Sequence, residues 1–333
     1  MPALGRTAAV VLAAAVVSTG LALAAGAGAL GQIPDARADS PDPVIAAVGD
    51  MACDPSSSSF KGGAGTASAC AELRMSGAVV HDSTVQGVLG LGDYQYYCGD
   101  AHDWAVSYQP TWGRIDDRID PIAGNHEYLT GIDPYGDTCP ADNTTAANFF
   151  DYFGASAHPE TAGHYSFDLG TWHLIGLNAN CSKKNVGGCT ATSAQTAWLS
   201  NDLATTTQPC VLAYWHQPLF TGQKAAVQKA YQPWWNLLYG AHADVVLNGH
   251  VHNYQRYPAL SPTGVAGSAG ITEYIVGTGG EAFQGISSSA KPYPSVYLRS
   301  FGYLRLTLGA NGWTAEFVNP NGVVLDTSSG TCH

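Results

Sequence analysis

The chain has 333 residues, of which 45% are hydrophobic and 12% are charged, and its formal net charge is −12. The apolar share is too high for a disordered chain, and the length allows one large or two modest hydrophobic cores. The acidic balance argues against general binding to nucleic acid, because that binding depends on Lys and Arg. An acidic enzyme that acts on phosphates would need local positive charge, which bound metal supplies.

The N-terminus has the pattern of an export signal. Arg6 precedes an Ala/Val/Leu-rich run over residues 7–30, and Ala36-Arg37-Ala38 forms an A-x-A cleavage pattern. The apolar run is long for a signal, so an uncleaved membrane anchor is the alternative. Because Ala and Gly dominate the run, we favour cleavage. We therefore predict a signal peptide over residues 1–38 and a single secreted, extracellular domain over residues 39–333.

The cysteine count is even, and every cysteine follows the predicted signal. The cysteines lie at positions 53, 70, 98, 139, 181, 189, 210 and 332, and no C-x-x-C pair occurs. In an exported chain this pattern favours disulfides over a thiolate metal site. We predict up to four disulfides that join nearest neighbours in the sequence. Cys181–Cys189 is the best supported pair, because a short loop costs little closure entropy.

Short apolar runs, each ending in a polar turn, are predicted to be buried strands. These runs are Val44–Val48, Val88–Leu91, Ile119–Ala123, Val211–Trp215 and Val245–Leu247. Asp, Asn or His stands just beyond each of them. Open α/β sheets bind ligands beyond the carboxyl ends of their strands. We therefore expect these polar residues to gather at one site.

Helical patterns occur in the second half of the chain, at Ser193–Leu203 and Lys224–Leu238. The final third favours strands at Ile271–Val276, Ser300–Leu308 and Trp313–Val318, with a hairpin turn before the last of them. The order of the expected elements predicts an α/β fold.

Five sequence blocks at the predicted strand ends carry oxygen or imidazole donors. They are Gly49-Asp50-Met51-Ala52, Gly92-Asp93-Tyr94-Gln95-Tyr96, Gly124-Asn125-His126-Glu127, Trp215-His216 and Gly249-His250-Val251-His252. Carboxylate and imidazole together suit Fe, Zn or Mn. Taken singly, each residue is more typical of a turn or of ordinary packing. The shared order and strand-end context favour a metal site.

The order GD, GDxxY, GNHE, a single His and GHxH resembles the calcineurin-like metallophosphoesterases over residues 49–252. The later block Tyr274–Gly280 is similar to a segment of secreted members. Most of the family has Asp-x-His in the first block, where this chain has Asp50-Met51-Ala52. Purple acid phosphatases also lack that His and use the Tyr of GDxxY, here Tyr96. The sequence therefore resembles the purple acid phosphatase branch, of a secreted bacterial type.

The resemblance implies a four-layer αββα sandwich of mixed sheets, with a site for two metal ions at the carboxyl ends of the strands. A tyrosinate ligand favours Fe(III) at metal one, and Fe(II), Zn or Mn would occupy site two. The ligands implied for metal one are Asp50, Tyr96 and His252, those for metal two are Asn125, His216 and His250, and the bridging ligand is Asp93.

The resemblance also implies a metal-dependent phosphoric ester hydrolase, in which a metal-bound hydroxide attacks phosphorus. His126 would protonate the leaving alkoxide or steady the phosphate, and Glu127 would orient His126. The expected substrates are phosphomonoesters, and no nucleic-acid scaffold role or membrane partner is expected after signal cleavage.

Two alternative functions are a phosphodiesterase or phospholipase with the same metals, and a non-catalytic secreted metal-binding protein. Gln217 follows His216 where related sequences often carry another His, so the phosphate contacts are expected to differ. The presence of every expected ligand and of His126 argues against a decayed site.

Overall fold

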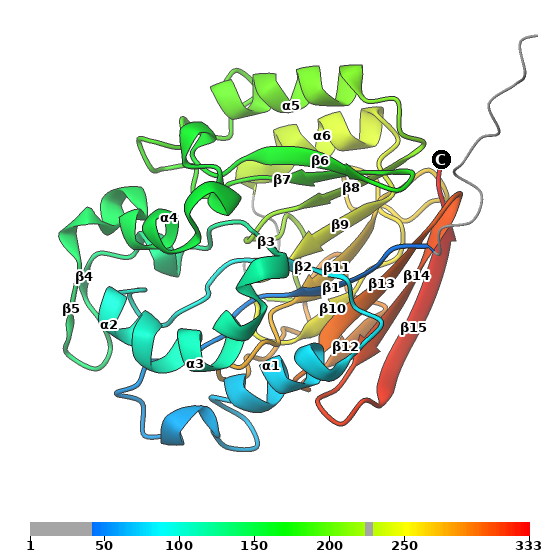
Figure 1. The fold of residues 1–333 in the computed structure, drawn as a ribbon. Helices are drawn as coiled ribbons and strands as arrows, with labels where there is room; N and C mark the ends of the chain where they lie inside the picture. Colours follow the sequence, from blue (N-terminus) through cyan, green and yellow to red (C-terminus); the bar gives the residue numbers. More distant parts are fainter. Residues whose placement is uncertain (1–41, 224–228) are drawn as a thin grey trace, which may run out of the picture. The chain divides into compact units, whose positions relative to one another are not determined.

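Two β-sheets form the centre of the computed structural model, which describes residues 42–223 and 229–333 (Figure 1). The expected signal peptide, residues 1–38, lies outside the described residues. The first sheet has the strand order β15 (Val324–Thr331), β14 (Gly312–Val318), β13 (Tyr303–Gly309), β1 (Val44–Val48), β2 (Gly87–Gly90) and β3 (Ile119–Pro121). The second has the order β12 (Val296–Leu298), β10 (Tyr254–Arg256), β11 (Thr272–Val276), β9 (Val245–Asn248), β8 (Cys210–Tyr214), β7 (Trp172–Gly176) and β6 (Tyr165–Leu169).

Three hydrophobic cores separate these sheets from each other and from the helices. Along β1, Ile45 and Ala47 pack between the sheets, whereas Ala46 and Val48 face the helices. Along β8, Leu212 packs between the sheets, whereas neighbouring residues pack toward the helices of the other layer. This follows from the two-residue period of a strand, which sends successive side chains to opposite faces. The four-layer αββα sandwich implied by the sequence is confirmed.

Helices cover the outer face of each sheet (Figure 1). The helices are α1 (Glu72–His81), α2 (Ala101–Asp103), α3 (Gln109–Thr111), α4 (Ala147–Phe153), α5 (Ala194–Thr205) and α6 (Gln232–Gly240). Of the helix expected over Lys224–Leu238, residues 224–228 lie outside the described residues. Helix α6 begins at Gln232, after a 3₁₀ turn over Lys229–Tyr231, and has Pro233 in its first turn, where a missing backbone N–H costs no hydrogen bond. Within the described ranges, no helix combines the length and apolar content that a membrane crossing requires.

Parallel pairing places the predicted donor blocks at neighbouring strand ends. Strand β1 pairs in parallel with β2, and β2 with β3. In the other sheet, β8 pairs in parallel with both β7 and β9. Because neighbouring parallel strands end on the same side of a sheet, the segments after β1, β2 and β3 meet, as do those after β8 and β9.

A nearly buried histidine ties the β6–β7 hairpin to α5. His173 Nδ1 lies 2.7 Å from Asp168 Oδ1, and His173 Nε2 lies 2.8 Å from Asp202 Oδ2. The Asp202 carboxylate also accepts a hydrogen bond from Ser166 Oγ at 2.7 Å. Although burial lowers the pKa of His173, Asp202 and Asp168 together raise it. Both ring nitrogens can donate to a carboxylate only when the imidazole is protonated.

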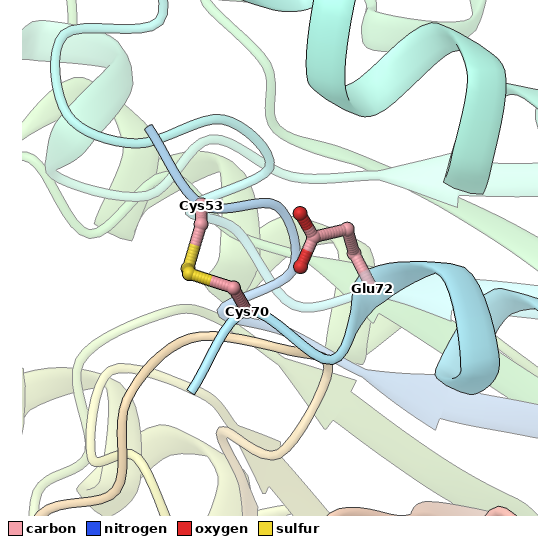
Figure 2. A group of neighbouring side chains, drawn as sticks. All are labelled: Cys53, Cys70 and Glu72. Atoms are coloured by element: carbon pink, nitrogen blue, oxygen red, sulfur yellow. A yellow bond between two sulfur atoms is a disulfide. The ribbon is translucent and has the colours of Figure 1, made fainter. Parts of the chain in front are cut away.

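The disulfides follow nearest-neighbour pairing, as predicted, and none of the cysteines is free. The pairs are Cys53–Cys70, Cys98–Cys139, Cys181–Cys189 and Cys210–Cys332. Figure 2 shows the first pair beside Glu72, whose carboxylate has an oxygen within 4.8 Å of both sulfurs. Because the sulfurs are oxidised, they offer no thiolate to a metal. Burial, followed by the charge of Glu281, raises the pKa of Glu72 to about 8.

Candidate metal centre

Four of the predicted ligands meet around the Tyr96 hydroxyl. Its oxygen lies 2.9 Å from Asp50 Oδ1, 3.1 Å from Asp93 Oδ2 and 3.0 Å from His252 Nε2. All four side chains are buried or nearly so. The two carboxylates, the phenol and the imidazole thus present four donor atoms to one small volume, as expected for metal one.

The other predicted ligands meet around His216. Its Nε2 lies 3.0 Å from Asp93 Oδ2 and 3.1 Å from Asn125 Oδ1. The donor atoms of Asp93, His216 and His250 all lie within 4.8 Å of one another. Asp93 therefore contacts both groups of donors, which is the position a bridging ligand requires. The structure brings together all seven residues that the sequence indicated as ligands.

Backbone carbonyl groups fix the orientation of the imidazoles. His216 Nδ1 donates a hydrogen bond to Leu91 O at 2.7 Å, and His252 Nδ1 donates to Ala282 O at 2.8 Å. A carbonyl oxygen can only accept, so the proton of each neutral ring is on Nδ1. The Nε2 atom of each ring then faces the carboxylates, and in the neutral ring this atom can bind a metal ion, as it does in histidines whose other N–H donates to a carbonyl group.

Three of the predicted ligand positions have a left-handed backbone. The φ angles are 60° at Asp50, 53° at Asp93 and 71° at His250. Such angles are uncommon outside glycine and persist only where the surroundings over-determine them. A Cβ on Gly124 would lie 2.1 Å from Asp93 Oδ1, so this glycine lets the two loops approach each other.

The Asp93 carboxylate is surrounded by groups that favour its charged form. His216 and His126 hold the pKa of Asp93 well below its usual range, although burial opposes this. Burial lowers the pKa of His216, but the Asp93 carboxylate more than compensates and raises it to about 9. Burial and the charge of His216 lower the pKa of His250 to about 4. A buried carboxylate of this kind must be paired with positive charge.

Without a metal ion, the surroundings of Tyr96 favour the neutral form of its phenol. Burial, followed by the charges of Asp50 and Asp93, raises the pKa of Tyr96 well above its usual range. Phenol, carboxylate and imidazole together are a donor set that suits iron, zinc or manganese. The donors present therefore fit the two metal ions that the sequence implies.

His126 lies beside the centre and Glu127 lies beneath it. His126 Nδ1 donates to Tyr97 O at 2.6 Å, and His126 Nε2 lies 3.9 Å from Asp93 Oδ2. The Glu127 carboxylate instead accepts from the backbone amides of Asp93 at 3.0 Å, Tyr94 at 2.8 Å and Gly124 at 2.7 Å. The Glu127 side chain points into these loops, so its expected orienting effect on His126 would act through the loop backbone and not through contact of the two side chains.

Two residues near the centre were not indicated by the sequence. Tyr97 supplies the carbonyl that holds His126, and their rings lie 4.8 Å apart. Glu281 is close enough for its charge to act on His252 and His126, and its carboxylate lies 3.0 Å from Cys53 Sγ. Burial raises the pKa of Glu281. The only sequence signal for Glu281 was its place directly after the block Tyr274–Gly280.

Gln217 lies next to the second group of donors. Its Nε2 lies 3.5 Å from Asn125 Oδ1, and its Oε1 is buried without a hydrogen-bond partner among the described residues. The side-chain amide of Gln217 therefore lies at the position where related sequences often carry a further His, and it offers a neutral group in place of an imidazole.

Comparisons with known proteins agree with this architecture. Residues 44–254 match the calcineurin-like phosphoesterase family. Purple acid phosphatase 23 of Arabidopsis thaliana is 29% identical over 45% of this chain and 33% of its own length. Acid phosphatase A of Cryphonectria parasitica is 25% identical over 73% of this chain and 61% of its own length.

Among solved structures, purple acid phosphatase PPD1 from yellow lupin superposes with a TM-score of 0.62 and 16% identity, over 87% of this chain and 53% of that one. At this identity the likeness concerns the fold alone. The chain spans between about a third and two thirds of the length of the curated relatives cited above. The family match covers more than half of this chain, which therefore belongs to the calcineurin-like phosphoesterases, with relatives among the purple acid phosphatases.

Proposed function

We propose that this chain is a secreted phosphatase that uses two metal ions to hydrolyse phosphomonoesters. The observation that carries the proposal is the single carboxylate of Asp93, which lies within 3.1 Å of the Tyr96 hydroxyl and within 3.0 Å of the His216 imidazole. One residue thereby joins an oxygen-rich group of donors to an imidazole-rich one. Two ions held in this way would lower the pKa of water and neutralise charge on the phosphoryl group.

The ligand roles follow from the two groups of donors. Tyr96 is the donor that distinguishes the first position, because a phenolate favours Fe(III), whereas Fe(II), Zn or Mn suits the second. The residues proposed to hold the first ion are Asp50, Tyr96 and His252, those proposed for the second are Asn125, His216 and His250, and Asp93 is shared.

His126 is the proposed general acid. Because Tyr97 O accepts from Nδ1, the Nε2 atom is the one that faces the centre and can hold the proton destined for the leaving oxygen. The backbone amide of His126 also donates to Asp93 Oδ1 at 2.8 Å, so the acid and the shared ligand are fixed to each other. Glu127 supports both by binding the amides of the two loops that carry them.

Secretion is supported by the export pattern of the N-terminus and by the paired cysteines, which persist in oxidising compartments. N-terminal sequencing of protein from the culture medium should find a start near Asp39. Recovery of a chain that starts at Met1 from a membrane fraction would instead indicate an anchor.

The deciding experiment compares turnover of a phosphomonoester and a phosphodiester by the metal-loaded protein. We expect kcat/KM to favour the monoester. A preference for the diester would assign the centre to a phosphodiesterase, and a protein with full metal content and no turnover of either ester would support the non-catalytic alternative. Asp93→Asn serves as the matched control, because it keeps the size of the side chain and removes its charge.

A further inference from the structure

A row of aromatic rings leads from the metal centre to the surface. We propose that Tyr97 and the β4–β5 hairpin form a wall that binds the leaving alcohol of the substrate, and that this wall selects flat, uncharged aromatic alcohols. The inference rests on the proposed phosphatase function, because it concerns the alcohol part of a phosphate ester. The hairpin consists of β4 (Gly131–Ile132), β5 (Thr138–Cys139) and the turn between them.

The rings are in contact in a fixed order. The ring of ligand Tyr96 lies 4.2 Å from that of His126, which lies 4.8 Å from that of Tyr97. The Tyr97 ring in turn lies 6.0 Å from that of Tyr135, at an interplanar angle of 75°. Tyr96 is buried, His126 and Tyr97 are partly exposed, and Tyr135 is 45% exposed. The row therefore opens toward solvent from the reacting centre.

The position of the acid determines where the alcohol must lie. A general acid acts within hydrogen-bond reach of the oxygen that it protonates, so the leaving oxygen has to lie next to His126 Nε2. The carbon skeleton attached to that oxygen then extends over the neighbours of the imidazole. On the outer side those neighbours are Tyr97 and, beyond it, Tyr135. Aromatic rings at such positions favour stacking and edge contacts with another flat ring.

The hairpin holds its exposed side chains in place. Cys139 on β5 is bonded to Cys98, which directly follows Tyr97 in the chain. Asp133 Oδ1 accepts from the backbone amides of Tyr135 at 2.9 Å and Asp137 at 2.8 Å, which closes the turn. A surface that is ordered before binding loses little entropy when a ligand arrives. The neighbouring Ile132, 76% exposed, adds apolar surface to the same hairpin.

Negative charge around the wall disfavours acidic alcohols. The Asp54 carboxylate accepts from the Tyr97 backbone amide at 3.3 Å, and Asp133 and Asp137 belong to the adjoining hairpin. Among the described residues, the Tyr97 hydroxyl has no hydrogen-bond partner, and so it is free to meet a neutral substrate. An alcohol that carries a further phosphate or carboxylate would be repelled by the same charges.

The test compares benzyl phosphate with propyl phosphate, whose alcohols are of similar acidity, so that the leaving-group chemistry is matched. The metal-loaded wild type should show a kcat/KM roughly tenfold higher for benzyl phosphate, the size expected of one good aromatic contact. Tyr97→Leu should abolish that preference, so that the kcat/KM values of the two esters become similar, whether or not both values fall. The substitution keeps the backbone carbonyl that holds His126, and Tyr293→Leu, at an exposed tyrosine elsewhere, should change neither value.

A second comparison tests the charge selection. 4-Carboxybenzyl phosphate should be hydrolysed several-fold less efficiently than benzyl phosphate. Equal kcat/KM values of the wild type for benzyl and propyl phosphate would contradict the proposed binding wall, and so would an equal loss for both esters in Tyr97→Leu. Equal values for the two benzyl esters would contradict the proposed selection by charge.

Binding of phosphonates separates this inference from the proposed function. Calorimetry with benzylphosphonate and propylphosphonate needs no turnover and should show the same preference in the wild type and its loss in Tyr97→Leu. If the protein binds benzylphosphonate in preference to propylphosphonate but hydrolyses no ester, the proposed binding wall is supported and the proposed phosphatase function is contradicted. If both esters are hydrolysed equally well and both phosphonates bind equally well, the proposed binding wall is contradicted and the proposed phosphatase function is supported.

Discussion

Tyr96→Phe removes one oxygen atom from the proposed centre and is its most direct test. If Tyr96 binds Fe(III) as a phenolate, the iron-loaded wild type should absorb visible light through charge transfer from the ligand to the metal, and the variant should lose that band. The variant should keep the fold, because the ring of Tyr96 stays buried and only the hydroxyl is deleted.

The cost in stability can be judged from the contacts of the hydroxyl. It lies within hydrogen-bond distance of both Asp50 and Asp93, and a hydrogen bond to a charged group contributes about 1.5–3 kcal/mol. Each carboxylate retains another donor, since the His250 amide lies 2.8 Å from Asp50 Oδ2 and the His126 amide lies 2.8 Å from Asp93 Oδ1. The metal-free variant should therefore lose about 1–2 kcal/mol, well below the ~5–15 kcal/mol of a typical domain.

The assay is the visible spectrum per bound iron, with iron measured by metal analysis, followed by denaturant unfolding of the metal-free proteins. Tyr94→Phe is the matched control, because Tyr94 is buried in the same loop and its hydroxyl has no partner within the described part of the chain. Tyr94→Phe should keep the band. A colourless iron-loaded wild type, or a Tyr96→Phe variant that stays coloured, would refute the iron–tyrosinate assignment and indicate another metal pair.

Three further predictions concern other residues of the proposed centre, the ion pairs of His173 and the cysteines. His126→Ala should keep its metal and lose about 10²–10⁴-fold in activity, whereas Asp93→Ala should lose both ions; metal analysis with the reverse result would contradict the assigned roles. His173 has a raised pKa in the folded protein, so its contribution to stability is full below its unfolded pKa of about 6.5 and is lost as the pH rises through the folded value. His173→Gln should accordingly lower the free energy of unfolding by about 1 kcal/mol more at about pH 5 than at about pH 9; an equal loss at both pH values would argue against the ion pairs. Alkylation without reductant should label few of the cysteines, and labelling of half of them would contradict the disulfides.

The strand ends and the gathering of the donor residues at one site were predictable, because each donor block directly follows an apolar run. Asp50 and His250 illustrate this, since they are far apart in the sequence and the Asp50 carboxylate nevertheless accepts from the His250 amide. The disulfide pairing was predictable because each cysteine pairs with its neighbour in the chain. Strand β7 (Trp172–Gly176) was missed, since the polar His173 interrupts its apolar run.

Contacts that depend on the direction of a loop could not be predicted from the sequence. Glu127 is adjacent to His126, yet the short turn over His126–Tyr128 places the two side chains in different surroundings. Adjacency alone cannot show this. Tyr97 and Glu281 reach the centre through the paths of their own loops, and no periodic pattern encodes such paths. For the same reason, the hairpin beside Tyr97 could not be recognised before the fold was known.

The donors come from both sheets, with Asp50, Asp93 and Asn125 beyond β1, β2 and β3 and with His216 and His250 beyond β8 and β9. Any ion that fills the centre would therefore link the two sheets, which are also joined by the Cys210–Cys332 disulfide and by the hydrogen bond from the His250 amide to Asp50. Its binding energy adds to the stability of the folded chain, by about 1.4 kcal/mol for each tenfold excess of free ion over the dissociation constant. We therefore expect the supply of metal in the surroundings to affect the resistance of this protein to proteolysis, in addition to its proposed chemistry.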